Sequence, residues 1–279
     1  MQLTCSELAK NVLLGDRRAL SKAITLVESV LPTHREDALE LLELLVPHTG
    51  NSIRIGISGA PGVGKSTFIE SFGNYVIDQG HRVAVLAVDP TSSVSGGSIL
   101  GDKTRMEVLS RKENAYIRPS PAGKTLGGVT RRTRETLLLC EAAGFDVIFV
   151  ETVGVGQSET LVAEMTDMFL LLLSPGSGDE LQGIKRGIME LADLILVNKS
   201  DGDQLPAANR TVSDYQLALH FLHSRSLNWT ARVQAISALT SQGIDVAWQA
   251  VIEYRNLLEH VGEISSRRTA QSCAWMWSE

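Results

Sequence analysis

Residues 53–67 read IRIGISGAPGVGKST, an apolar run followed by a glycine-rich turn and a Lys-Ser pair. The turn fits the pattern GxxxxGK[ST], in which backbone N–H groups of a glycine-rich loop cradle phosphate oxygens. The pattern requires a strand before the loop and a helix after it, because the N-terminus of a helix favours an anion. The segment therefore predicts a loop that binds the phosphates of a nucleoside triphosphate. The residues expected to bind them are Gly59, Ala60, Pro61, Gly62, Val63, Gly64, Lys65, Ser66 and Thr67.

Outward from this loop, short apolar runs recur along the chain, each followed by a stretch with helical spacing. Near-continuous hydrophobic strands that alternate with helices are typical of a mostly parallel sheet covered on both faces. The sequence thus predicts the α/β fold of a P-loop NTPase, with a mostly parallel central sheet and flanking helices. The expected strands are 52–58, 83–89, 115–118, 147–151, 168–174, 194–198 and 233–237.

The two ends of the chain have a helical pattern without strands. Apolar residues recur at helical spacing over 6–47, and Pro32 with the polar stretch after it divides them into two or three helices. After residue 243 a helical pattern returns, for which we expect a buried stripe. We divide the chain into an N-terminal helical extension (1–50), a nucleotide-binding domain (51–242) and a C-terminal helical segment (243–279). The residues of the expected stripe are Val246, Val251, Leu257 and Leu258.

Composition narrows the class of protein. The 279 residues carry 26 Lys and Arg against 32 Asp and Glu, a net charge of −6, which disfavours nucleic acid as the main partner. Three well-separated cysteines are neither a disulfide framework nor a CxxC metal site, and fit a reducing compartment. No signal peptide pattern is present, and the longest apolar run, 168–173, is too short to span a bilayer. We expect a soluble cytoplasmic protein without a membrane partner.

The tetrad NKSD at 198–201 indicates that the base is guanine. The carboxylate of Asp201 can accept hydrogen bonds from the N1–H and the exocyclic amine of guanine, whereas adenine presents no such donor pair. We expect Asn198 at the other edge of the purine and the stem of Lys199 along the ring. The triplet SAL at 237–239 follows the next strand and is expected to place backbone N–H groups near the guanine carbonyl oxygen. The expected base-binding residues are Asn198, Lys199, Asp201, Ser237, Ala238 and Leu239.

Acidic residues after two predicted strands indicate a Mg²⁺ site. The segment ETVG at 151–154 stands where GTPases commonly carry DxxG, and Glu151 keeps the carboxylate that orients Mg²⁺. Asp89 and Asp102 lie in a loop rich in glycine and serine, which suits a switch over the metal and the phosphates. Ser66 is expected to ligate Mg²⁺ through its hydroxyl, and Gln157 is a candidate to position the attacking water.

Five segments taken together, GAPGVGKST, VDPTSS, GSILGDKTRM, ETVGVGQSE and NKSD, resemble the MeaB/ArgK family of GTPases. These proteins are associated with adenosylcobalamin-dependent acyl-CoA mutases, chiefly methylmalonyl-CoA mutase, and were formerly labelled lysine/arginine/ornithine transport kinases. The resemblance implies a homodimer that hydrolyses GTP to GDP with Mg²⁺. It would act as a chaperone that gates cofactor delivery to the mutase and protects it from inactivation.

The same resemblance assigns individual residues. It implies phosphate binding at 59–67 with Lys65 over the phosphates, guanine binding by the six residues above, and Mg²⁺ and switch roles for four residues. It further implies that Lys185, in the segment SGDELQGIK, links the nucleotide state to the partner. The family continues as a longer C-terminal helical arm than the one here, so we expect a shortened dimerisation arm. The metal and switch residues are Ser66, Asp89, Asp102 and Glu151.

Three other functions share parts of this pattern. An ATP- or GTP-dependent kinase linked to basic amino-acid transport would share the P-loop but would need a phosphoryl-acceptor site. A metallochaperone GTPase would need a cluster of metal ligands, and the chain offers His220 and His223, at i and i+3 on one helical face, with no cysteine near them. A module that holds GTP without turnover would carry the same motifs, because hydrolysis can depend on a group from a partner.

Overall fold

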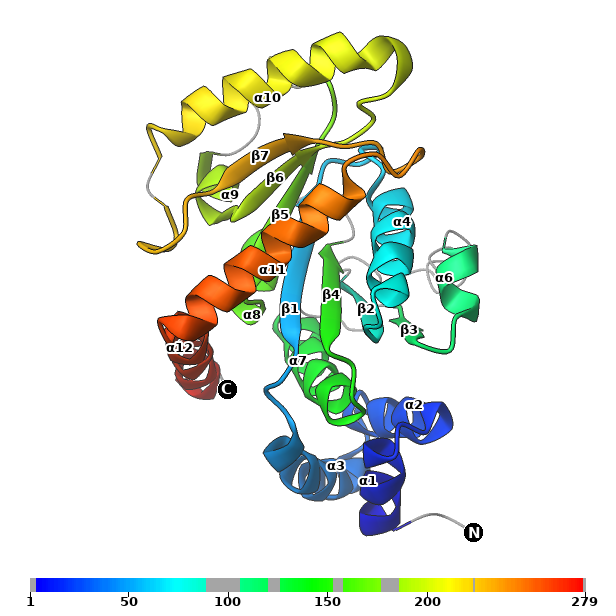
Figure 1. The fold of residues 1–279 in the computed structure, drawn as a ribbon. Coiled ribbons are helices and arrows are strands. Elements are labelled where there is room, and N and C mark those ends of the chain that lie inside the picture. The colour runs from blue at the N-terminus through cyan, green and yellow to red at the C-terminus, as the bar shows by residue number, and fades with distance from the viewer. Residues whose placement is uncertain are drawn as a thin grey trace.

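The computed structural model describes residues 4–88, 106–119, 126–152, 158–176, 186–222 and 224–277. Seven strands form one sheet in the order β3-β2-β4-β1-β5-β6-β7, and every pairing is parallel (Figure 1). All seven predicted strands are confirmed. Their bounds are β1 (Ile53–Gly59), β2 (Val83–Val88), β3 (Ala115–Arg118), β4 (Val147–Thr152), β5 (Met168–Leu173), β6 (Leu194–Val197) and β7 (Arg232–Ala235).

The inner strands are buried on both faces, which explains the unbroken apolar character of β2, β5 and β6. Every residue of β1, β2, β4, β5 and β6 is buried. A strand with one solvated face would alternate apolar and polar residues, and β2, β5 and β6 do not. β1 alternates isoleucine with Arg54, Gly56 and Ser58, yet both of its faces are buried. β1 lies between β4 and β5, with Ile57 opposite Glu151 and Gly59 opposite Leu172. The carboxyl ends of β1, β4 and β6 therefore bring three of the predicted motifs to one edge of the sheet.

Helices cover both faces of the sheet (Figure 1). One apolar cluster joins the sheet to α4, α6 and α11, through side chains such as Phe72, Leu109 and Trp248. The other joins it to α7, α8, α9 and α10, through side chains such as Leu137 and Val162. The bounds of these helices are α4 (Lys65–Asp78), α6 (Glu107–Arg111), α7 (Leu126–Ala142), α8 (Ser158–Met165), α9 (Arg186–Leu191), α10 (Leu205–Leu219) and α11 (Ile244–His260).

Two of the four residues predicted to form the buried stripe of α11 are exposed. Val251 and Leu258 are buried, but Val246 is 51% exposed and Leu257 is 39% exposed. The buried residues of this helix recur at spacings of three and four, as one face of an α-helix requires. Val246 and Leu257 fall outside that face. The buried residues are Ile244, Ala247, Trp248, Ala250, Val251, Tyr254 and Leu258.

Three helices and a short 3₁₀ turn precede β1, as predicted: α1 (Cys5–Leu13), α2 (Arg17–Val27), α3 (Pro32–Leu45) and η1 (Val46–His48). Asp16 accepts hydrogen bonds from the N–H groups of Arg18 and Ala19 and so begins α2 as an N-cap. α2 and α3 pack on α7, and their apolar residues belong to the same core cluster as that face of the sheet. In Figure 1 these helices lie at the opposite end of the molecule from the start of α4.

The last helix, α12 (Glu263–Trp277), is fixed to the amino-terminal end of the sheet by polar contacts. Arg268 donates from Nε to Asp167 Oδ1 at 2.7 Å and from its terminal nitrogens to the carbonyls of Gly50 and Ser52. Beside it, Arg54 pairs with the buried carboxylate of Glu141. We call these four side chains, Arg54, Glu141, Asp167 and Arg268, the buried ion cluster. None of the described helices has the length and apolar character needed to cross a bilayer.

Candidate nucleotide-binding site

The loop between β1 and α4 has the backbone geometry that its glycines permit. Gly64, the residue before α4, has φ 93°, a conformation that side chains rarely adopt. A Cβ atom at Gly64 would lie 2.7 Å from Asn198 Nδ2, and one at Gly59 would lie 2.5 Å from the carbonyl oxygen of Leu172. Glycine is therefore required at both positions, by the loop conformation and by the neighbouring strands. The predicted order of strand, loop and helix is present.

Lys65 begins α4 and turns its ammonium group back onto the loop. Its Nζ donates to the carbonyl oxygens of Gly59 and Ala60, at 2.8 and 3.4 Å. Burial lowers the pKa of Lys65 below its usual value, and the negative charges of Glu151 and Glu159 act in the opposite direction. A partly desolvated cation beside a glycine-rich loop is suited to bind an anion, since the surrounding protein screens its charge less than water does.

Glu151 is buried at the end of β4, beside the P-loop. Its neighbour Thr152 donates from Oγ1 to Ser58 Oγ at 3.0 Å, which joins the ends of β4 and β1. Carboxylate and hydroxyl oxygens are the ligands that Mg²⁺ takes in proteins, so the donor set of Glu151 and Ser66 fits this ion. The other predicted metal, water and switch residues, Asp89, Asp102, Gln157 and Lys185, lie outside the described residues.

Glu159 ends the segment ETVGVGQSE, but it has no predicted role in the sequence analysis. It lies in the first turn of α8, is buried, and its charge acts on Lys65. α8 approaches β1 closely, since a Cβ atom at Gly56 would lie 2.8 Å from Val162 Cγ1 and 2.9 Å from Thr166 Oγ1. Glu159 lies one turn before Val162, so the same helix face carries it toward the end of β1. The spacing of Glu159, Val162 and Thr166 is the sequence signal that finds it.

Asn198 connects the base-binding segments to the P-loop. Its Nδ2 donates to the carbonyl oxygen of Val63 at 2.9 Å, and its Oδ1 accepts from the N–H of Ala238 at 3.0 Å. Lys199, at φ 60°, donates from Nζ to the carbonyl oxygen of Gly62 at 2.7 Å. The predicted guanine-binding segments 198–201 and 237–239 therefore lie against the loop 59–67. The side-chain amide of Asn198 contacts both the loop and Ala238 and so connects the three segments.

Asp201 and Ser237, two of the predicted base-binding residues, contact each other. Ser237 donates from Oγ to Asp201 Oδ1 at 2.6 Å and accepts from the N–H of Thr240 at 3.2 Å. The side chain of Leu239 is exposed at the same turn. The structure thus brings together all six predicted base-binding residues, which come from two segments about 40 residues apart.

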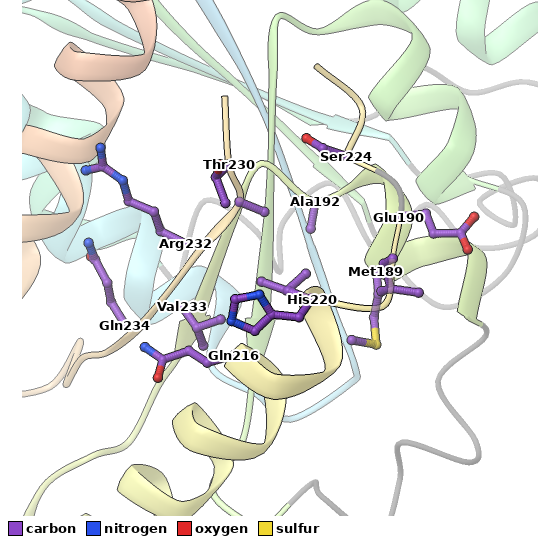
Figure 2. A pocket seen from close by; sticks show the side chains of 13 residues that line it. Met189, Glu190, Ala192, Gln216, His220, Ser224, Thr230, Arg232, Val233 and Gln234 are labelled. Carbon is purple, nitrogen blue, oxygen red and sulfur yellow. The ribbon is translucent and has the colours of Figure 1, made fainter. Parts of the chain in front are cut away.

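Of the two histidines weighed for a metallochaperone, only His220 lies within the described residues. α10 ends at Leu219, so His220 follows the helix, and His223 lies outside the described part of the chain. His220 lines a cavity of about 650 Å³ between the end of α10, α9 and β7. Figure 2 shows its ring near Val233 and Gln216, with the Glu190 carboxylate pointing away from it. Within the described ranges no three His, Cys, Asp or Glu side chains are grouped to hold a metal ion.

The parallel sheet, the glycine-rich loop before α4 and the lysine that begins this helix define a nucleotide-binding protein of the P-loop class. A family model described as methylmalonyl-CoA mutase-associated GTPase MeaB matches residues 20–279. The chain belongs to the MeaB family.

Individual relatives agree with this assignment. GTPase ArgK of Escherichia coli is 50% identical over 275 residues, which are 99% of this chain and 83% of ArgK. The mitochondrial methylmalonic aciduria type A homolog of Mus musculus is 52% identical over 274 residues, 95% of this chain and 66% of that protein. The crystal structure of a LAO/AO transport system kinase superposes with a TM-score of 0.85 at 42% identity, covering 99% of this chain and 82% of that one. The chain is a GTPase and binds guanine nucleotide.

Proposed function

We propose that this GTPase is a chaperone and gate for an adenosylcobalamin-dependent acyl-CoA mutase of the methylmalonyl-CoA mutase type. It assists loading of the mutase cofactor and protects the loaded enzyme from inactivation. The observation that carries the proposal is the family model, whose description names association with methylmalonyl-CoA mutase and which matches residues 20–279. The mouse relative, named for methylmalonic aciduria, supports it.

The P-loop residues 59–67 hold the phosphates. Lys65 exchanges its contacts with the carbonyls of Gly59 and Ala60 for contacts with the β- and γ-phosphates, because charge-assisted hydrogen bonds are the stronger ones. Ser66 and Glu151 would hold Mg²⁺, with Asp89 and Asp102 as further ligands. When bound, Mg²⁺ neutralises charge on the phosphate oxygens.

At the other end of the nucleotide, Asp201 accepts from the guanine donors once Ser237 releases its carboxylate or shares it. Asn198 already receives the N–H of Ala238, so the base-binding loops are ordered before the base arrives. Preorganised groups lose less entropy on binding, which favours affinity. Lys199, Ala238 and Leu239 complete the base site.

Five further assignments belong to this proposal. Gln157 positions the attacking water, and Lys185 connects the nucleotide state to the mutase. The protein acts in the cytoplasm as a homodimer. Its domains are an N-terminal helical extension (1–50), a GTP-binding domain (51–242) and a C-terminal helical segment (243–279).

The deciding experiment measures binding of the purified GTPase to purified methylmalonyl-CoA mutase of the same organism. Calorimetry is run with GTP-loaded and GDP-loaded protein, and mutase inactivation during turnover is followed with and without the GTPase. We expect binding that depends on the nucleotide and slower inactivation. Absence of binding in every nucleotide state contradicts the proposal.

A kinase linked to basic amino-acid transport is the alternative, and the name of the LAO/AO transport system kinase is the observation that favours it. Such an enzyme would transfer the γ-phosphoryl group to an acceptor and would have no reason to prefer guanine. Titration with GTP and ATP separates the two functions. ATP binding as tight as GTP binding, together with phosphoryl transfer to a transport component, would favour the kinase.

A further inference from the structure

A groove on the face of the N-terminal helices combines apolar and basic side chains. It lies between the α2–α3 turn, α3 and α7, and its volume is about 340 Å³. On its apolar side Val30 is 77% exposed, Leu31 is 53% exposed and Leu39 is 47% exposed. Side chains of this kind gathered in one groove are typical of an interaction site, whereas scattered exposed residues are not. We call this surface the α3 groove.

The charges around the α3 groove are opposite to those of the chain as a whole. Arg35, Arg131 and Arg132 line it, and its one carboxylate, Glu135, is paired with Arg131. The chain carries a net charge of −6. On α3 itself, Arg35 lines the groove, whereas the acidic residues of this helix are not among the residues that line it. Those exposed acidic residues are Glu36, Asp37, Glu40 and Glu43.

The walls of the groove are held in place by polar contacts. Ser29 Oγ lies 2.8 Å from His34 Nδ1 and accepts from the N–H of Leu31 at 3.3 Å, which orders the α2–α3 turn. Glu28, at the end of α2, forms an ion pair with Arg118 at the end of β3. A surface that is ordered before a partner arrives loses less entropy on binding. The exposed apolar residues are therefore presented on a fixed frame.

We propose that the α3 groove is a docking site for an amphipathic helix of the client protein, with apolar residues on one side and acidic residues at its margins. Apolar anchors fill the space beside Leu31 and Leu39, and carboxylates meet Arg35 and Arg132. A helix suits the groove better than an extended strand, because its walls are helices and a turn and offer no strand edge. The inference rests on the proposed function, which makes the client the mutase.

The test uses two groove variants and two matched variants on α10. Val30→Glu and Arg35→Glu change exposed groove residues, and Leu217→Glu and Arg210→Glu make the same changes on a distant exposed surface. Each full-length variant is titrated with the purified mutase by calorimetry, after GTP binding and thermal unfolding have been matched to the unaltered protein. We expect each groove variant to weaken mutase binding at least about tenfold, and each α10 variant to change it less than about twofold.

Salt gives a second readout. Between about 0.1 M and about 1 M salt the screening length falls from about 10 Å to about 3 Å. Mutase binding by the unaltered protein should weaken over this range, and binding by Arg35→Glu should weaken less, because one of the attractive charges is already reversed. A purely structural effect of the substitution would leave the salt dependence unchanged.

The possible results distinguish an error in the docking site from an error in the proposed function. If the unaltered protein binds the mutase and the groove variants bind it equally well, the docking site is wrong and the proposed function stands. If the unaltered protein does not bind the mutase, both are wrong. If the groove variants alter self-association in sedimentation, or binding to anionic phospholipid vesicles, while mutase affinity is unchanged, the occupant is a second copy or a membrane, and the proposal is overturned.

Discussion

Lys65 and Lys199 both donate to carbonyl oxygens of the loop between β1 and α4. These contacts satisfy two cations in the loop that we expect to bind phosphate. Nucleotide binding therefore replaces one set of hydrogen bonds with another, and its net gain comes from the charge of the phosphates. Replacing Lys65 or Lys199 should therefore change GTP affinity according to whether its ammonium group contacts the loop carbonyls or the phosphates when the nucleotide is bound.

Replacing Lys65 with alanine should abolish tight GTP binding. We expect the ammonium group to be the main cation over the β- and γ-phosphates, and loss of about 3 kcal/mol of charge-assisted hydrogen bonding corresponds to about a hundredfold in affinity. Calorimetric titration with GTP measures this. Lys10→Ala, in α1, is the control and should bind normally. Unchanged GTP affinity in Lys65→Ala would show that the P-loop assignment is wrong.

Replacing Asp201 with asparagine should relax the choice of base toward xanthosine nucleotides. The amide reverses one donor–acceptor relation, so a base with a carbonyl in place of the exocyclic amine becomes a better match. We expect the ratio of GTP to XTP affinity to fall at least about tenfold. Competition binding with both nucleotides measures the ratio. A preference for GTP as strong as that of the unaltered protein would count against the base-site assignment.

At the scale of elements, the close packing of α8 on β1 positions the site. Gly56 allows Val162 and Thr166 to approach the strand, and the same helix carries Glu159 toward Lys65. α8 begins directly after residues 151–157, which contain the ETVG motif. A shift of this helix would therefore move a buried carboxylate at the nucleotide site.

Gly56→Ala should destabilise the protein by about 1–3 kcal/mol, because the added methyl group overpacks a close contact. Urea denaturation measures the free energy of unfolding. Gly187→Ala is the matched control: Gly187 lies in α9, and nothing lies within 4 Å of the position of its added Cβ atom. That variant should be as stable as the unaltered protein or more so. Equal stability of Gly56→Ala and the control would contradict the packing argument.

The sequence is most informative at this scale, and its limits are visible in α11. The strands were predictable because a strand buried on both faces is a short unbroken apolar run that stands out against helical spacing. The expected stripe of α11 is wrong at Val246 and Leu257, because hydrophobicity alone does not place a residue on the buried face of a helix. The helix instead buries Ala247, Trp248 and Tyr254, which follow the helical period. Where small and aromatic residues lie on the same helix face, the helical period predicts the buried residues better than hydrophobicity does.

At the scale of the whole molecule, the buried ion cluster joins the start of the sheet to the last helix. Arg268 reaches Asp167, 101 residues earlier in the chain, and Ser52, 216 residues earlier. Glu141 accepts hydrogen bonds from Arg54, Ser52 and the N–H of Gly50. The sequence could not predict this cluster. An arginine in a helix is most simply interpreted as a solvent-exposed residue, and the residues near Arg268 in the sequence do not identify a partner 101 residues away. The P-loop, by contrast, lies within nine consecutive residues.

Arg268→Ala should destabilise the protein by about 3–5 kcal/mol, because it leaves the buried carboxylate of Asp167 without its guanidinium partner. Lys112→Ala removes the exposed ion pair with Asp78 and should cost less than about 1 kcal/mol. Denaturant unfolding of both variants provides the comparison. Similar small effects of the two substitutions would mean that the cluster does not fix α12 to the sheet.

The buried ion cluster also has a consequence for the order of events during synthesis. Ribosomes add about 5–20 residues per second, so Arg268 is made on the order of 5–20 s after Asp167, its partner 101 residues earlier. Until Arg268 is made, the cluster holds only Arg54, Glu141 and Asp167, and Asp167 lacks its ion pair with Arg268. The contacts of Arg268 with the end of the sheet where β1 begins can therefore form only after 216 further residues have followed Ser52.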